Sequence, residues 1–161
     1  MRRTMMVNME MVFADFEQLL RHHCGTWVCQ RTRFYLDGTP ANHGKAQLEV
    51  TDLGPDAPHP LGLVLTWTEH NQPAGRTTLA FDPDSSRFWH YPGNGAPTTG
   101  HYRWNTDGVL ELTLPWGDGL QVQERLWFAA PNLRLRTVLV KKEQGLLAAS
   151  FYSDIRRLNS P

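Results

Sequence analysis

The sequence predicts a mainly β protein, an antiparallel up-and-down β-barrel with one N-terminal α-helix. Two observations predict this fold class. Helical periodicity occurs in one passage, between Val12 and Cys24, whereas the chain after Gly25 consists of short apolar runs divided by turn residues. About ten such runs follow one another, mostly ~8–12 residues apart, which indicates an antiparallel meander. Closing a meander into a barrel removes its exposed edges.

Length and charge restrict the class of protein. At 161 residues the chain suits one domain, which we expect to span residues 12–157 after a flexible leader, residues 1–11. The net charge of +0 argues against a nucleic-acid partner and against an electrostatic membrane anchor. No apolar run approaches the ~20 residues of a membrane span, and the start lacks the apolar segment of a secretory signal. We therefore expect a cytoplasmic protein whose Cys24 and Cys29 are reduced.

The first element is an amphipathic helix of about three turns, expected over residues 12–24. Acidic residues near its start and the basic run from Arg21 to His23 near its end suit the helix dipole. Gly25 is expected to end the helix. Its apolar residues recur at steps of three and four: Phe13, Phe16, Leu19 and Leu20.

The strands are bounded by residues that favour turns, such as Asp37-Gly38 and Asp107-Gly108. The Pro- and Gly-rich stretches 54–60 and 92–97 are interpreted as loops within the domain. The expected strands are Thr26–Leu36, Gly44–Thr51, Leu61–Glu69, Gly75–Phe81, Arg87–Tyr91, Thr99–Thr106, Val109–Leu114, Leu120–Ala129, Leu133–Lys141 and Leu147–Arg156.

The segment Glu124–Lys142 reads as two of these strands joined by a turn at Ala130-Pro131-Asn132. If the turn centres near Ala130, alternation places one carboxylate and two guanidinium groups on the same face. That face is either a solvated salt-bridge stripe or the polar floor of a pocket for an anionic ligand. It contains Glu124, Leu126, Phe128, Arg134, Arg136 and Val138, and the opposite face contains Trp127, Leu133, Leu135 and Leu139.

A barrel of roughly 8–10 strands can hold one small ligand inside it. The 6 tryptophans suit a large, flat, conjugated ligand, although aromatic residues also simply fill protein cores. Trp67 is the best candidate for a ligand contact, because it lies mid-strand on one face with Leu65 and Glu69.

Four segments of the chain resemble the S/U-type (CpcS/CpeS-like) phycobiliprotein chromophore lyases. They are Gly25-x-Trp27-x-x-Gln30-Arg31-Thr32, the mid-chain Trp67, Glu124-Arg-Leu-Trp-Phe-Ala-Ala-Pro-Asn-Leu-Arg-Leu-Arg-Thr137 and Ala149-Ser-Phe-Tyr-Ser-Asp-Ile-Arg156. The match covers almost the whole chain in order, and the third segment is its most specific part. The resemblance implies a calycin, lipocalin-like barrel. It also implies an enzyme that attaches a phycobilin through a thioether bond to a cysteine of an apo-phycobiliprotein subunit, for phycobilisome antenna assembly.

The resemblance also implies roles for individual residues. Glu124 would be the catalytic carboxylate, which meets the pyrrole N–H groups and favours the protonated, more electrophilic chromophore. Arg134 and Arg136 would grip propionates as forks, and Trp67 would form a wall of the chromophore site. The attacking thiol would come from the acceptor protein, while the lyase orients and encloses the phycobilin, such as phycocyanobilin or phycoerythrobilin.

Three further residues are candidate ligand contacts. Asp154 and Arg156 alternate on the last expected strand with Ser150 and Tyr152, and they are either a surface pair or site contacts. From this strand Ser150 and Asp154 are the candidate ligand contacts. His22, with His23, either lines the mouth of the barrel or is an exposed residue at the helix end. Val138 departs from the resemblance, which implies a small polar residue after Arg-Leu-Arg-Thr and therefore leaves chromophore preference open.

No metal or nucleotide cofactor is expected. His22, His23, Cys24 and Cys29 form a single group, whereas structural zinc usually needs paired ligands at two short spacings. A nucleophilic cysteine in this chain is chemically reasonable, but a free cysteine is more often a small buried apolar residue.

Two other functions stay open. One is a non-catalytic calycin that carries a tetrapyrrole or another hydrophobic anion and transfers nothing. The other is a structural β-domain with a filled core. Because members of the resembled family occur as homodimers and as heterodimers with a paralogue, both assemblies are expectations for this chain.

Overall fold

The computed structural model describes residues 11–54, 61–143 and 145–158. In these residues a helix, α1 (Phe16–His23), precedes a series of strands. The largest difference from the expected strands is at the fourth, which begins at Gln72 and not at Gly75. The strands are β1 (Gly25–Tyr35), β2 (Asn42–Asp52), β3 (Leu61–Glu69), β4 (Gln72–Phe81), β5 (Arg87–Pro92), β6 (Thr98–Trp104), β7 (Leu110–Pro115), β8 (Leu120–Ala130), β9 (Leu133–Lys142) and β10 (Gly145–Arg156).

The helix is shorter than the sequence predicted. It begins at Phe16 because Asp15 is extended and its side chain accepts a hydrogen bond from Gln18 N at 2.8 Å, which caps the first turn. It ends at His23, since Cys24 is already extended. Of the expected leader, residues 1–11, only Met11 lies within the described residues, and it packs against the core.

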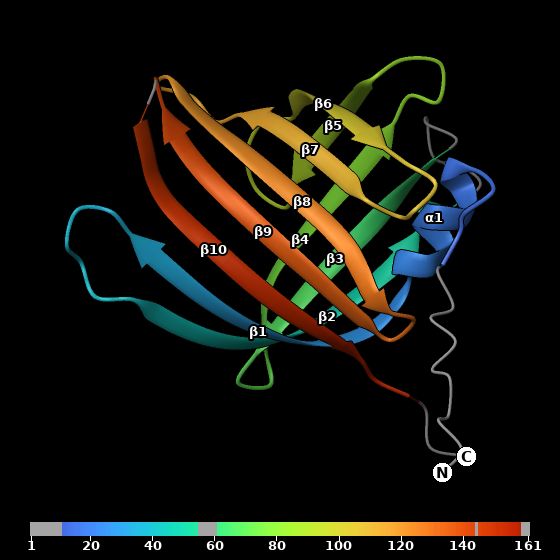
Figure 1. The fold of residues 1–161 in the computed structure, drawn as a ribbon, viewed down its shortest axis with the longest axis horizontal. Coiled ribbons are helices and arrows are strands. Elements are labelled where there is room, and N and C mark those ends of the chain that lie inside the picture. Colours follow the sequence, from blue (N-terminus) through green and yellow to red (C-terminus); the bar gives the residue numbers. More distant parts are fainter. Residues whose placement is uncertain (1–10, 55–60, 144, 159–161) are drawn as a thin grey trace, which may run out of the picture.

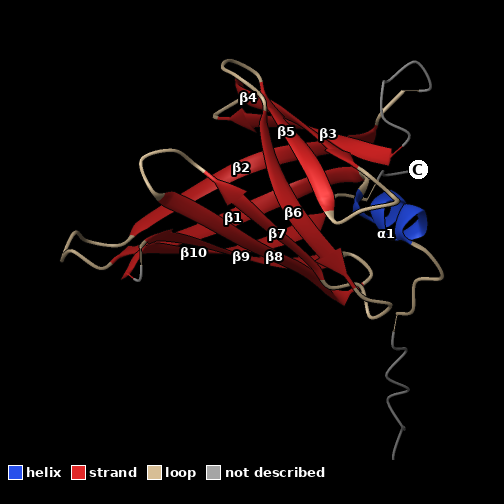
Figure 2. Ribbon diagram, turned by 90° about the horizontal axis from the view of Figure 1, so that it is seen from above, coloured by secondary structure: helices blue, strands red, loops and turns tan. Residues whose placement is uncertain are grey.

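The strands form a closed antiparallel barrel in which each strand pairs with its neighbours in sequence and β1 pairs with β10. The predicted fold class, an up-and-down barrel with one helix, is therefore confirmed. Figure 1 shows α1 at one end of the barrel and the β1–β2 hairpin projecting at the other. Figure 2 shows the same arrangement from above.

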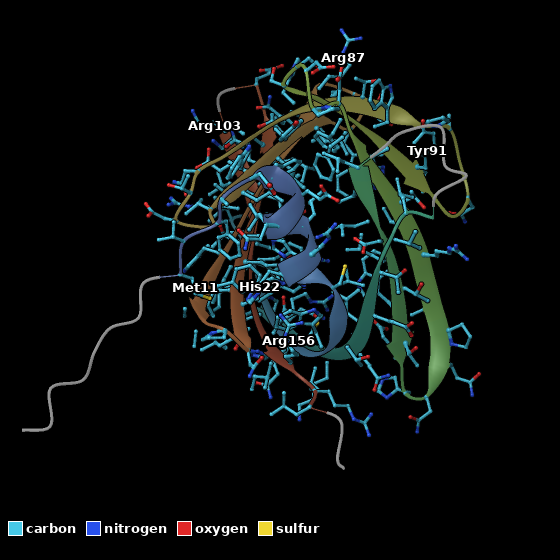
Figure 3. The ribbon with its side chains drawn as sticks, turned by 90° about the vertical axis from the view of Figure 1, so that its right-hand side faces the viewer. Met11, His22, Arg87, Tyr91, Arg103 and Arg156 are labelled. Atoms are coloured by element: carbon cyan, nitrogen blue, oxygen red, sulfur yellow. The ribbon has the colours of Figure 1, made fainter. Side chains whose placement is uncertain are left out.

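Aromatic and aliphatic side chains fill the barrel beneath α1, which lies across this end (Figure 3). The Phe16 ring stacks on Tyr102 with centroids 4.9 Å apart and meets the edge of Phe81 at 5.1 Å. We call this the helix end. Burial of its apolar surface stabilises the fold, and its most deeply buried side chains include Leu19, Leu20, Trp27, Leu48, Phe81 and Phe88.

Side chains that face the interior at the opposite end are only half-buried. Residues directly opposite one another on paired strands share a face, so the register identifies the inward-facing set. We call this the open end. Its inward-facing, half-buried side chains include Arg31, Arg33, Tyr35, Leu65, Trp67, Thr77, His90, Leu114, Val122 and Val138.

Candidate functional site

A buried charged cluster lies inside the barrel on β9 and β10. The side chains of Arg134, Arg136 and Asp154 are 2%, 7% and 0% exposed. Arg134 Nε donates to Asp154 Oδ2 at 2.9 Å, and Arg136 Nε donates to the same oxygen at 2.6 Å. Arg136 Nη2 also donates to Asp154 Oδ1 at 3.2 Å. One carboxylate therefore fixes the positions of two guanidinium groups.

Glu124 extends this cluster from β8. Its Oε1 lies 3.5 Å from Arg136 Nη1, and its side chain keeps 26% exposure. Glu124 lies opposite Val138. A turn centred at Ala130 would instead place it opposite Arg136, two residues earlier in β9. A shift of two preserves the face, so the predicted grouping of these residues is confirmed. Because that face points into the barrel, the solvated-stripe interpretation is wrong.

Mutual neutralisation keeps the buried groups charged. Burial would lower the pKa of Arg136, but Asp154 and Glu124 overcome that effect and raise it. Burial would likewise raise the pKa of Asp154, yet Arg136 and Arg134 hold it below its ordinary value. Burial, together with Arg136, lowers the pKa of Arg134, although a guanidinium stays protonated in proteins. We call Arg134, Arg136, Asp154 and Glu124 the charged floor.

His23 joins the charged floor to α1, a role that sequence reasoning missed. It is 1% exposed, whereas an exposed helix-terminal histidine was the main alternative. Arg134 Nη1 donates to His23 Nδ1 at 3.0 Å, so the ring accepts there and its proton resides on Nε2. Burial and then Arg134 hold the His23 pKa well below its usual value. Trp27 Nε1 also donates to the His23 carbonyl at 2.9 Å.

His22 belongs to the helix end. Its ring lies 4.4 Å from the Phe128 ring and 5.4 Å from the Phe13 ring, and its Nε2 is 3.1 Å from the Pro131 carbonyl oxygen. Arg156 Nη2 donates to the His22 carbonyl at 2.6 Å (Figure 3). The structure thus places His22 with the packing around α1 and does not bring it to Trp67.

Arg31 and Arg33 are two open-end residues that the candidate set omitted. Both face the interior from β1, and among the described residues neither has a carboxylate within 4.0 Å. Arg31 Nη2 donates to Asn42 Oδ1 at 2.7 Å, while its buried Nε has no hydrogen-bond partner. The alternation of Trp27, Cys29, Arg31 and Arg33 was the sequence signal that could have identified them.

Ser150 also faces the interior, where its Oγ accepts a hydrogen bond from Arg33 Nε at 3.0 Å. It lies directly opposite Val138, the position where the resemblance implied a small polar residue. The hydroxyl at this level of the barrel therefore comes from β10, next to a guanidinium from β1.

Trp67 lies on β3, facing the interior directly opposite Gly75. A Cβ atom at Gly75 would sit 3.5 Å from Trp67 Cε3, so the indole covers this glycine. The indole is half-buried and packs against the edge of the core. Its exposed part can form an aromatic wall at the open end.

Neither cysteine is prepared for nucleophilic attack. Burial, then Asp52, raises the pKa of the Cys24 thiol to about 12. Burial, then Asp154, raises the pKa of the Cys29 thiol to about 12 as well. The thiolate is the reactive form, so both groups are inert near neutral pH.

A groove of about 550 Å³ lies across β6 to β9. Its lining includes Arg103, Glu111 and Arg125, which point outward and form exposed ion pairs. Such exposed pairs contribute little to stability. The lining also includes Glu124 of the charged floor, so the groove reaches the floor at this one residue while most of its lining is on the outer face.

No group of three or more His, Cys, Asp or Glu side chains among the described residues is arranged to hold a metal ion. No helix in this part of the chain is long and apolar enough to cross a membrane.

Together these residues form a polar floor, an aromatic wall and two guanidinium groups at the open end. Such an arrangement can bind a flat, anionic, conjugated molecule: arginines bind carboxylates as forks, and a carboxylate accepts hydrogen bonds from N–H groups.

Comparisons with known proteins give matches to one family. The family model for CpeS-like proteins matches residues 63–157. Chromophore lyase CpcS/CpeS 1 of Synechocystis sp. is 31% identical, over 89% of this chain and 91% of that protein. Chromophore lyase CpcS/CpeS of Thermosynechococcus vestitus is 29% identical, over 88% and 92%. The S-type phycobiliprotein lyase CPES from Guillardia theta superimposes with a TM-score of 0.73 over 89% of this chain and 93% of that one, at 20% identity. This last likeness shows the fold.

Proposed function

The chain belongs to the CpeS-like family of chromophore lyases, and from this premise we propose that it attaches a phycobilin to a cysteine of a phycobiliprotein subunit. The observation that carries this proposal is the charged floor, because Glu124 and Arg136 sit inside the barrel beneath half-buried, inward-facing side chains. A filled structural core does not require four charged groups within it, since burying charge is costly.

The bilin lies in the open end with its pyrrole N–H groups toward Glu124 and one face against Trp67. Glu124 accepts hydrogen bonds from these groups and favours the protonated chromophore. Its partner Arg136 holds the carboxylate in place at 3.5 Å. Asp154 in turn fixes Arg136, so the floor is organised before the bilin arrives.

The propionate contacts are assigned to Arg31 and Arg33, with Ser150 beside them. Arg134, the sequence-based candidate, is 2% exposed and already donates to Asp154 and His23. Its Nη2 has no hydrogen-bond partner among the described residues, but that atom is fully buried and out of reach of a ligand at the open end. Arg136 is likewise paired with two carboxylates. Arg31 and Arg33 face the interior and keep donors for an incoming carboxylate.

The bond forms by addition of the acceptor's cysteine to the ethylidene group of ring A. Sulfur bonds to the ethylidene carbon, the thiol proton ends on the chromophore, and nothing leaves. Protonated bilin draws electron density from that carbon and so lowers the barrier. The lyase contributes orientation and enclosure, and its own thiols stay out of the reaction.

Co-expression with a bilin-synthesis pathway and candidate apo-subunits tests this function. A chromophore that stays on the acceptor after denaturation supports thioether transfer. A spectral change that is lost on denaturation supports the alternative, a non-catalytic carrier.

We also propose that the protein works in the cytoplasm, as a homodimer or as a heterodimer with a paralogue. The free thiols of Cys24 and Cys29 are compatible with a reducing compartment. Sedimentation of the pure chain, alone and mixed with a paralogue, distinguishes these assemblies.

A further inference from the structure

We propose that an apolar patch beside the open end is the surface on which the acceptor protein docks during transfer. This rim patch consists of Phe34, Leu36, Leu147 and Phe151. The proposal rests on the proposed lyase function, since a carrier that transfers nothing needs no such contact.

The rim patch is contiguous and exposed. Its side chains are 51%, 61%, 45% and 43% exposed in the order given. Leu36 N donates to the Leu147 carbonyl at 3.2 Å, which places these two residues side by side. Phe34 lies opposite Ala149, and Phe151 is the next outward residue on β10. An exposed apolar cluster of this kind marks a binding surface more often than a scattered apolar residue does.

The rim patch is the outer side of the same chain segment that faces the bilin. On β1, Phe34 points outward between the inward-facing Arg33 and Tyr35. On β10, Phe151 points outward between Ser150 and Tyr152. A protein seated on the rim patch therefore stands next to the proposed propionate contacts.

The acceptor has to approach from this end. The interior of the helix end is filled, with Leu19, Trp27 and Phe81 each 0% exposed. The chain's own thiols are inert, so the nucleophile must come from outside. It can reach a bilin above the charged floor only through the half-buried open end. A second copy of this chain on the same rim would obstruct that route.

Charged residues lie on the border of the rim patch. Lys141 lies opposite Leu146, and Lys142 follows it at the end of β9. Lys45 points outward from β2 opposite Gln30, four residues along β1 from Phe34, and so lies outside this border. These are the only lysines in the sequence. Asp37 follows Leu36, and Glu143 follows Lys142, so the border carries charges of both signs. An apolar centre with such a border fits a partner with an apolar surface and a mixed polar rim around its acceptor cysteine.

The test compares two double variants that each change one residue of β1 and one of β10. The rim variant is Phe34→Ser with Leu147→Ser. The control is Val28→Ser with Ile155→Ser, a directly opposed, outward-facing pair that is 42% and 55% exposed and lies toward the helix end. Full-length proteins are loaded with bilin and mixed with apo-acceptor. Bilin spectra, sedimentation and the rate of thioether formation are then measured.

We expect both variants to bind bilin with the wild-type spectrum. The rim variant should lose about tenfold or more in kcat/KM for the acceptor, and the control less than about twofold. Equal rates for the rim and control variants would overturn the docking proposal while leaving the lyase function intact. Loss of bilin binding in the rim variant, or dissociation of a wild-type dimer in step with lost transfer, would also overturn it. A wild-type protein that forms no thioether with any acceptor contradicts the lyase function itself.

Discussion

The two ends of the barrel are built from the same ten strands but are packed differently. At the helix end, α1 packs Phe16, Leu19 and Leu20 into the core, and these side chains are at most 7% exposed. At the open end the inward-facing residues, Trp67 and Arg33 among them, are half-buried. Apolar burial at one end supplies stability, so the other end can keep groups that favour a ligand over close packing.

The charged floor is where the two ends meet. Arg134 faces His23 from the helix end, and Glu124 faces the open end, with Asp154 and Arg136 between them. A change on the helix-end side of the floor should therefore affect stability first, and a change on the open-end side should affect bilin handling first.

The largest expected effect is on stability, from Asp154→Ala. This change leaves two buried guanidinium groups without their shared carboxylate. We expect the free energy of unfolding to fall by about 3–5 kcal/mol in urea denaturation. The matched control is Glu111→Gln on the outer face, whose exposed pairs should cost less than about 1 kcal/mol. Similar losses in the two variants would show that the floor does not differ energetically from the surface.

Arg31→Ala and Arg33→Ala act at the open end. Each should weaken bilin binding by about 1.5–3 kcal/mol, the range for a hydrogen bond to a charged group, with little change in stability. Arg76→Ala, at an exposed outward position of β4, is the control. Fluorescence titration with bilin measures the affinities. If all three variants bind alike, the propionates are held elsewhere.

Trp67→Ala removes the aromatic wall. Bilin binding should weaken by about 1–3 kcal/mol, because a stacking surface is lost, while the fold remains largely intact. Absorbance titration measures the bilin affinity, and near-ultraviolet circular dichroism checks that the fold is intact. Normal binding by a folded variant would assign Trp67 to the core instead.

The smallest expected effect on transfer comes from the cysteines. Cys24→Ala and Cys29→Ala, singly and together, should transfer bilin at the wild-type rate; loss in a folded variant would reveal a covalent relay.

The raised pKa of about 12 for each thiol also predicts a pH dependence of stability. The stabilising contribution is complete below the unfolded-state pKa, about 8.5, and is lost as the pH rises toward 12. In alkaline denaturation, the variant that combines Cys24→Ala and Cys29→Ala should therefore lose less stability than the wild type as the pH rises.

Local patterns predicted much of the fold and part of the site. Alternation is a local property, so it placed Glu124, Arg134 and Arg136 on one face although the turn was misplaced by one position. Helix length was overestimated because Asp15 acts as a cap, and apolar periodicity does not show where a cap ends the pattern. The inward positions of Arg31 and Arg33 beside β10 depend on the closure of β1 onto β10. That pairing joins opposite ends of the sequence, so no local pattern reveals it.

Glu124→Gln tests the central claim most directly, that the open-end side of the charged floor stabilises the protonated bilin and orients it. The substitution keeps size and a hydrogen-bond acceptor but removes the charge that faces the pyrrole nitrogens. Bilin bound to the variant should lose the red-shifted absorption of a protonated chromophore, and transfer should slow by more than binding weakens. An unchanged bound spectrum together with full transfer would contradict this account of the site.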